Sequence, residues 1–454
     1  MTRLALIGLF VVAVAGAGGA LLARPNAALR QIDVSRAPGS QNQVAIAANP
    51  AGTQLLAASN SLDPGSPDRG NRVAVYTSGD GGSTWKTFSP DATSTSRCST
   101  ADAVPAIGPG GLQLVAFVAR LCSVPFDVAS LGIDVVFRRG ALAPWSRAVV
   151  APISPAYGND KPATAIDSSP GSPHRGRAYV AWSRWQGVDV PIRIALSTSD
   201  DGGRSWSPPR PVAGLRDAVS GFASLSIGPG GAVYLAWTDD RRNVFVTRSV
   251  TGGAAFERPV LVARAVGPPS ALCGYSGVAI PAQPRRCITT DPSVVATAAN
   301  VYVTWTGPRA GGVDQDVLVR SFSPSLEPLA PPTPVSVPAS ARRGDQFHGA
   351  ASFDQSDDRL WICFYDTGAD PRGVRARYSC TASRDGSRWA PTLPVASVAS
   401  DETTDAALDS GYGDYEGVLA AAGVAHPIWT DSRLSRSRGE EIFATALTAR
   451  RLRG

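Results

Sequence analysis

The sequence predicts an all-β protein built from repeated four-stranded antiparallel blades, that is, a β-propeller. The 454 residues include 46 Gly and 37 Pro, a density of backbone breakers that excludes a helical bundle. The chain is 43% apolar and has ten Trp, which excludes a disordered polypeptide. A strand-like pattern recurs at intervals of about 55 to 70 residues, in the range of propeller blades.

The N-terminus predicts export. Arg3 is followed by an apolar or small-residue stretch, Leu4 to Leu22, which is typical of a signal sequence. A stretch of this length also just crosses a bilayer. Residues 1–28 are therefore expected to be a signal peptide or an N-terminal membrane anchor. Residues 29–454 are expected to form one secreted or extracytoplasmic domain, periplasmic or on the cell surface.

The charge pattern excludes one class of partner. The net charge is +6, with no basic stripe interleaved with aromatic residues, so nucleic acid is not an expected partner. No later apolar run approaches the length of the leader, so membrane contact is expected only through the N-terminal segment. The sequence does not specify an oligomeric state.

Six cysteines fit an oxidising compartment. Six cysteines allow fifteen pairings, and we expect the sequential one because each pair lies within one repeat. The expected disulfides are Cys98–Cys122, Cys273–Cys287 and Cys363–Cys380. The chain has no CxxC motif and only three scattered histidines, so neither zinc nor any other cofactor is expected. Structural calcium bound by clustered carboxylates is a minor alternative, because no contiguous ligand loop is visible.

Each repeat consists of four short strands. The second strand recurs at 54–60, 112–120, 177–185, 232–242, 300–309, 359–368 and 424–433, and all copies after the first carry an aromatic residue near the end. A first strand precedes it, as at 42–52, 161–171, 222–231 and 292–300. A third follows, as at 72–78, 193–199, 243–249 and 375–383. A fourth, Pro-rich run leads onward, as at 208–214 and 390–397.

The unit count predicts how the ring closes. Strands this short bury both faces only when units stack. Seven blades are preferred, and six are the alternative because the first two copies are weaker. The last unit ends after its third strand at 440–449, and residues 28–35 have the pattern of a lone fourth strand. We therefore expect the two chain ends to meet in one blade.

A turn motif lies between the third and fourth strands of three units, at 78–85, 199–206 and 383–389, with a decayed copy at 249–256. Its aspartate accepts hydrogen bonds from turn amides, its glycines tolerate positive φ, and its tryptophan packs back on the blade. The expected structural residues are Asp80, Trp85, Asp201, Trp206, Asp385 and Trp389. The motif resembles the Asp-box, or bacterial neuraminidase (BNR) repeat, of the sialidase superfamily. The resemblance covers the chain after the leader and implies a sialidase-like propeller, but these turns are structural and say little about activity.

The resemblance also places ligands on the face opposite these turns, where first strands start and second strands end. Carboxylates, arginines and a tyrosine converge there, which favours a binding site. The candidate ligand-binding residues are Arg184, Arg241, Arg309, Arg433, Lys161, His348, Asp366 and Asp431. The tryptophans at the second-strand ends, Trp182, Trp237, Trp305 and Trp429, are instead expected to pack between blades.

A sialidase-like hydrolase uses arginines to clamp the sugar carboxylate, a tyrosine nucleophile, a glutamate base and an aspartate acid. The catalytic candidates are Tyr415, Glu416, Asp160 and Asp291. Adjacent strand residues point to opposite faces, so Tyr415 and Glu416 serve each other only at a bulge. The chain lacks the Phe/Tyr-Arg-Ile-Pro motif of active bacterial sialidases, and PIRIA at 191–195 is only a superficial echo.

Two functional hypotheses follow. The first is a sialidase-like propeller that binds a carbohydrate or another anionic ligand at its mouth, with exo-sialidase-like glycoside hydrolysis as the finer reading. The second is a non-catalytic surface scaffold that binds a protein or a glycan. The polar mouth with its GDYEG segment favours the first, and the missing arginine motif favours the second.

Overall fold

The computed structural model describes residues 28–62, 71–123, 130–186, 192–212, 223–239, 241–264, 277–310, 312–336, 343–403, 411–434 and 439–453. Within these ranges the chain forms seven four-stranded antiparallel sheets and one two-stranded sheet. The prediction of an all-β protein with four-stranded antiparallel units is confirmed. The count of four-stranded sheets in these ranges agrees with the preferred number of blades.

The strands of the first four sheets follow chain order. They are β2 (Ser40–Ala48), β3 (Leu55–Leu62), β4 (Asn71–Ser78) and β5 (Lys86–Phe88); β6 (Arg97–Gly108), β7 (Leu112–Leu121), β8 (Gly132–Arg139) and β9 (Ser146–Ala151); β10 (Gly158–Ile166), β11 (Ala178–Trp185), β12 (Arg193–Ser199) and β13 (Arg210–Pro211); and β14 (Ser224–Ile227), β15 (Val233–Thr238), β16 (Val244–Ser249) and β17 (Val260–Ala263).

An additional two-stranded sheet then precedes the last three four-stranded sheets. It consists of β18 (Val278–Ile280) and β19 (Gln283–Ile288). The remaining strands are β20 (Ser293–Ala296), β21 (Val301–Pro308), β22 (Gln315–Phe322) and β23 (Thr333–Pro334); β24 (Gln346–Asp354), β25 (Arg359–Asp366), β26 (Arg377–Ser383) and β27 (Leu393–Pro394); and β28 (Gly417–Ala421), β29 (Val424–Asp431), β30 (Glu441–Ala444) and β1 (Ile32–Asp33).

Short 3-10 turns connect some strands. They are η1 (Pro90–Thr93), η2 (Pro109–Gly111), η3 (Pro229–Gly231), η4 (Ser432–Leu434) and η5 (Ala449–Arg453). In the part of the chain described here, no helix has the length and apolarity needed to cross a membrane.

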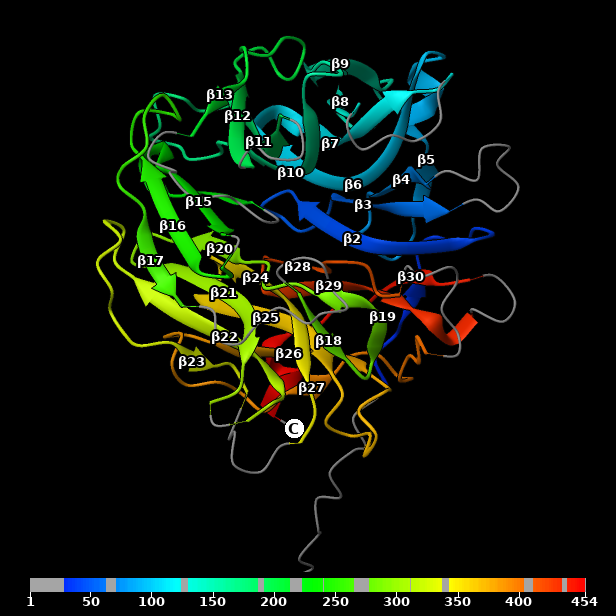
Figure 1. The fold of residues 1–454 in the computed structure, drawn as a ribbon, viewed down its shortest axis with the longest axis vertical. Coiled ribbons are helices and arrows are strands. Elements are labelled where there is room, and N and C mark those ends of the chain that lie inside the picture. Colours follow the sequence, from blue (N-terminus) through cyan, green and yellow to red (C-terminus); the bar gives the residue numbers. More distant parts are fainter. Residues whose placement is uncertain are drawn as a thin grey trace, which may run out of the picture.

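The first strands of neighbouring sheets contact one another in a closed circuit: β2 with β6, then β10, β14, β20, β24, β28 and back to β2. Figure 1 follows this order by colour, and the red β30 returns to the blue β2. The N-terminal β1 pairs with β30, with Ile32 opposite Ala444. The prediction that the two chain ends meet in one blade is therefore confirmed.

The predicted turns form hydrogen-bonded hairpins with one shared pattern. In the first sheet the Ser78 hydroxyl donates to Asp80 (2.8 Å), and the Thr84 amide donates to the same carboxylate (2.9 Å). The Trp85 indole donates to the Gly82 carbonyl (3.0 Å). The hydrogen bonds from Thr84 lower the pKa of Asp80 to about 2.

Equivalent hydrogen bonds occur in the other copies. The amides of Ser205 and Arg388 donate to Asp201 (3.0 Å) and Asp385 (2.8 Å), respectively. The Trp206 indole donates to the Gly203 carbonyl (3.1 Å). The decayed copy keeps the serine contact, since the Gly253 amide donates to the Ser249 hydroxyl (3.0 Å).

These turn tryptophans do not pack only on their own sheets. Trp206 packs on a core formed largely by the preceding sheet, and Trp389 packs on a core that includes Tyr302 of β21. The second-strand tryptophans also lie between sheets, because each is at most 3% exposed and packs with side chains of the preceding sheet. These buried residues are Trp182, Trp237, Trp305 and Trp429. Their expected role in interblade packing is confirmed.

Two of the three predicted disulfides are present, Cys98–Cys122 and Cys363–Cys380. Cys287 is also disulfide-bonded, and its expected partner Cys273 lies outside the described residues. Residues 1–27 of the predicted leader lie outside them as well.

Candidate functional site

One position of each first strand faces the same end of the central channel. The register of the first two strands defines this position. In the third sheet Ala181, just before Trp182, pairs with Ala163, and in the sixth Cys363, just before Phe364, pairs with Ala350. In six of the seven four-stranded sheets, the residue two positions before this first-strand partner has a polar side chain. These six residues, here called the mouth ring, are Gln43, Asp102, Lys161, Asp291, His348 and Tyr415. The seventh equivalent position, Phe222, lies outside the described residues.

The backbone is strained at this layer. Gln43, Asp102, Lys161 and His348 have positive φ angles of 61°, 58°, 54° and 52°. Each lies where the register of β2, β6, β10 or β24 shifts at a β-bulge. A left-handed non-glycine residue costs on the order of 1–3 kcal/mol, and such strain concentrates at functional sites. Four such residues at one register position therefore mark this layer as a candidate site.

A continuous network of hydrogen bonds and ion pairs joins the first three sheets to the last. The Gln43 amide donates to Asp102 (2.5 Å), and Lys161 Nζ donates to the same carboxylate (2.9 Å). Lys161 Nζ also donates to Asp414 Oδ2 (2.7 Å). Asn60, at the end of β3, donates to Gln43 Oε1 (2.9 Å) and accepts from the Asp102 amide (2.9 Å). Asp102 and Lys161 are thus fixed from several directions.

The two-stranded sheet completes the network. Arg286 of β19 donates through both Nε and Nη2 to Asp414, the Nε bond measuring 2.7 Å. Gln283 of the same strand donates to the Gly413 carbonyl (3.2 Å). Ile280 and Ile288 pack into the core of the last two sheets, so this hairpin is anchored over the mouth.

Electrostatics fix the protonation of these groups. Burial alone would lower the pKa of Lys161, but the Asp102 and Asp414 carboxylates outweigh it and raise the pKa. Burial would raise the pKa of Asp414, but Lys161 and Arg286 hold it well below the usual range. Burial, and next the Asp102 charge, raise the pKa of Asp160 well above its usual value. Lys161 is therefore cationic and Asp414 anionic, and the surroundings of Asp160 favour its protonated form.

A cavity of about 270 Å³ lies below the mouth ring and is lined by first strands of all seven four-stranded sheets. Asp291, His348 and Tyr415 of the ring line it, together with Asp414. Its volume is close to the lower end of small-molecule pockets.

His348 is the clearest sign that this cavity receives a ligand. The residue is 5% exposed, and among the described residues neither ring nitrogen has a hydrogen-bond partner. Burial lowers the pKa of His348 to about 3, so the imidazole is neutral and offers one donor and one acceptor. Phe347 and Tyr365 contact the ring edge-on, at centroid distances of 5.0 and 6.2 Å. Buried polar groups are nearly always satisfied, so a ligand or water is expected at this ring.

The structure separates Tyr415 from Glu416. Tyr415 lies in the mouth ring, and burial followed by the nearby Asp102 carboxylate raises its pKa well above the usual value. Glu416 instead accepts a hydrogen bond from the Tyr365 hydroxyl (2.9 Å) and another from the Thr430 amide (3.1 Å). Burial raises the pKa of Glu416. Glu416 also lines the mouth cavity, but its carboxylate is engaged by Tyr365 and Thr430 of the last two sheets.

Two of the predicted ligand-binding arginines are held by carboxylates of their own sheets. Arg309 donates to Asp314 (3.0 Å) and to Asp316 (2.8 Å), and its side chain is 9% exposed. Arg433 donates through Nε (2.7 Å) and Nη2 (2.6 Å) to Asp431. Asp431, predicted at the site, therefore neutralises Arg433.

The other predicted residues occupy separate surroundings. Arg184 stacks on the Tyr157 ring with its Cζ 3.7 Å from the centroid, and Arg241 is exposed. Asp366 accepts a hydrogen bond from the Gly368 amide (2.8 Å), which closes a loop. Within the described ranges Arg309 and Arg433 pair with different carboxylates, whereas Lys161 and Arg286 share Asp414.

Sequence reasoning missed Gln43, Asp102 and Arg286 as site residues. If the repeats had been aligned with one another by their second strands, Gln43 and Asp102 would have fallen at the same repeat position as Lys161 and His348. Arg286 lies in a segment without the repeat pattern, so no such signal exists for it. Arg242, next to the predicted Arg241, is buried, donates to the Thr290 hydroxyl (3.3 Å), and has its pKa lowered by burial.

In the parts of the chain described here, no three His, Cys, Asp or Glu residues are grouped so as to hold a metal ion. The carboxylates of the mouth are instead engaged by Lys161, Arg286 and Gln43. Their arrangement suits hydrogen bonding and proton transfer rather than metal ligation.

No protein-family model and no curated protein matches the chain. Among solved structures, a Hadza microbial sialidase is 15% identical, with a TM-score of 0.43, covering 84% of this chain and 73% of that one. A phage phi92 endosialidase is 10% identical (TM-score 0.49; 92% and 69% covered), and a Penicillium chrysogenum alpha-L-arabinanase complexed with arabinobiose is 11% identical (0.46; 92% and 98%). Likenesses of this degree carry no argument about activity, so the function must be argued from the mouth itself.

Proposed function

We propose that this protein is an extracytoplasmic propeller of the sialidase-like type that binds an uncharged carbohydrate at its mouth and hydrolyses a glycosidic bond. The observation that carries the proposal is His348, which lines the mouth cavity and whose two ring nitrogens have no hydrogen-bond partner within the described ranges. A sugar hydroxyl can both donate to and accept from such a neutral imidazole. The disulfides support the extracytoplasmic location.

The charge balance favours an uncharged ligand. The two cations of the network, Lys161 and Arg286, face the carboxylates of Asp102 and Asp414. Their charges therefore cancel, and a ligand carboxylate would have to compete with buried internal partners. Arg242 lies near the ring through Thr290 and is the cation that would favour an acidic sugar. Sialosides therefore belong in the test as the contrasting substrate.

Asp160 is the proposed general acid. A glycosidase acid must be protonated at the working pH, and the raised pKa of Asp160 meets this requirement. Asp291, which precedes β20 and lines the mouth cavity, is the proposed second carboxylate, as base or nucleophile. Tyr415 is proposed to bind the sugar rather than to attack it, because Glu416 is engaged by Tyr365 and is not placed to take its proton.

A binding-only propeller is the second candidate. It is favoured by the same engagement of Glu416 and by the ion pairs that hold Arg309 and Arg433. Such a protein would keep the mouth ring as a glycan-binding surface without the second carboxylate in a catalytic position.

A hydrolysis assay separates these candidates. The full chain would be tested on 4-methylumbelliferyl glycosides of neutral sugars and of sialic acid, beside Asp160→Asn, Asp291→Asn and Tyr415→Phe. We expect turnover of a neutral glycoside, with kcat reduced by about 100-fold or more in each Asp variant. Tyr415→Phe should mainly raise KM. Loss of kcat only in Tyr415→Phe would contradict the assigned roles, and absence of turnover on every substrate would leave the binding-only candidate.

A further inference from the structure

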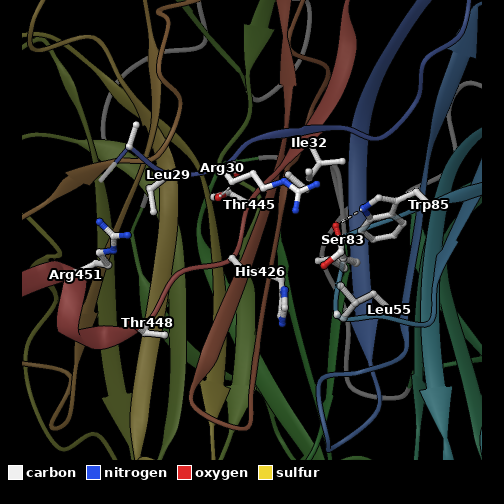
Figure 2. Close-up of a pocket in the computed structure, with 16 residues that line it drawn as sticks. Leu29, Arg30, Ile32, Leu55, Ser83, Trp85, His426, Thr445, Thr448 and Arg451 are labelled. Atoms are coloured by element: carbon white, nitrogen blue, oxygen red, sulfur yellow. Dashed lines mark hydrogen bonds between the residues drawn. The ribbon is translucent and has the colours of Figure 1, made fainter. Parts of the chain in front are cut away.

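A second cavity lies at the seam where the ring closes, on the face opposite the mouth. This cavity, here called the seam pocket, has a volume of about 410 Å³. Its lining comes from both chain ends and from the first and last sheets, and Figure 2 shows the side chains that surround it. Leu29 and Arg30 precede β1, Trp85 closes the first hairpin turn, and His426 belongs to β29. The pocket therefore bridges segments that are far apart in sequence.

The walls are apolar and the polar lining is basic. Leu55, Ile46 and the half-buried Trp85 form much of the wall. Arg30 and Arg451 provide the cationic groups, and among the described residues that line the pocket none is acidic. The mouth cavity differs, since Asp291, Asp414 and Glu416 line it. The seam pocket is therefore the cavity whose lining favours an anionic ligand.

His426 gives an independent indication of a ligand. The residue is 5% exposed and lines the pocket between the two chain ends (Figure 2). Its imidazole has no hydrogen-bond partner in the described part of the chain. A built Cβ on Gly82 would lie 3.9 Å from His426 Nδ1, which shows how closely the turn borders the ring. A buried imidazole without a partner, in a pocket with two arginines, suits an oxygen acceptor.

We propose that the seam pocket binds a small monocarboxylate with an aromatic or aliphatic body. The carboxylate is received by Arg30 and His426, and the body packs on Trp85 and Leu55. A sugar acid fits less well, because its hydroxyls would face an apolar wall. A ligand held by β1, the first hairpin turn and β29 stabilises the closed ring. This inference concerns a different cavity and does not rest on the proposed function.

Calorimetric titration of the full chain tests the inference with three matched probes: indole-3-acetate, uncharged tryptophol and cationic tryptamine. We expect indole-3-acetate to bind at least about tenfold more tightly than tryptophol, because charge-assisted hydrogen bonds are the stronger ones. Tryptamine should bind more weakly than both. Binding of indole-3-acetate should also raise the Tm.

Matched variants assign the effect to the pocket. Arg30→Gln changes an exposed residue and should reduce the affinity for indole-3-acetate to that for tryptophol. Arg210→Gln, an equally exposed arginine on β13, should leave it unchanged. Equal affinities for the three probes, no binding of any probe, or an Arg30→Gln variant that binds like the parent protein would each overturn the proposal.

Discussion

Asp414→Asn is expected to lower the free energy of unfolding by about 3–5 kcal/mol, the largest effect of any single charge removal at the mouth. The Asp414 side chain is 7% exposed and receives Lys161 from the third sheet and Arg286 from the two-stranded sheet. Its removal leaves Lys161 and Arg286, whose side chains are 17% and 35% exposed, without their shared anion. Urea unfolding followed by circular dichroism measures the loss.

An exposed ion pair provides the matched control. Asp200 also receives an arginine, Arg177, but the Asp200 side chain is 67% exposed. Asp200→Asn is therefore expected to cost less than about 1 kcal/mol. Equal losses in the two variants would show that the mouth network contributes no more than a surface salt bridge.

The second large effect is a loss of stability in mild acid caused by two buried histidines. Burial lowers the pKa of His348 to about 3 and that of His426 to about 4, whereas the unfolded residues titrate near 6.5. A lowered folded pKa means that the unfolded state binds protons first, so stability is present above pH 6.5 and is lost as the pH falls. At pH 5 this amounts to about 2 kcal/mol for each histidine.

Asp160 and Glu416 oppose this trend, because their raised pKa values favour the folded state as the pH falls. A comparison of variants removes their contribution, since both groups titrate in parent and variant alike. His348→Gln should lose about 2 kcal/mol less than the parent protein between pH 7 and pH 5 in urea unfolding. Coincident pH dependences would contradict the buried, neutral state of His348.

The architecture could be predicted because its causes are repeated in the sequence. Alternating apolar residues with an aromatic near the second-strand end recur in every four-stranded sheet except the first. Buried Trp182 and Trp429 show why, because each fills the space against the preceding sheet. The lone strand at 28–35 could be assigned because the last unit lacked one. The two-stranded sheet was missed, because residues 278–288 have no counterpart in other repeats.

The site was predicted only in part. The sequence does not show where each side chain points, nor which nearby carboxylates pair with the predicted arginines. Lys161, Asp291, His348 and Tyr415 do come together in one ring around the cavity. The arginines were selected by position at strand ends, but a guanidinium binds the nearest carboxylate, and for Arg309 that is Asp316 of the same sheet. Arg286 reaches Asp414 across 128 residues of chain, a contact that spacing alone does not indicate.

Histidine NMR tests the central claim most directly, because the chain has only three histidines and each lies in a different place. His348 lines the mouth cavity, His426 lines the seam pocket, and His174 follows β10 on the third sheet. Protein labelled with [¹³Cε1]histidine would be titrated with methyl glycosides of glucose, galactose, mannose, arabinofuranose, N-acetylglucosamine and sialic acid. Single His→Gln variants assign the three signals. The account predicts that a neutral glycoside shifts the His348 signal and leaves those of His426 and His174 in place. A His348 signal that no glycoside moves, or that only the sialoside moves, would contradict it.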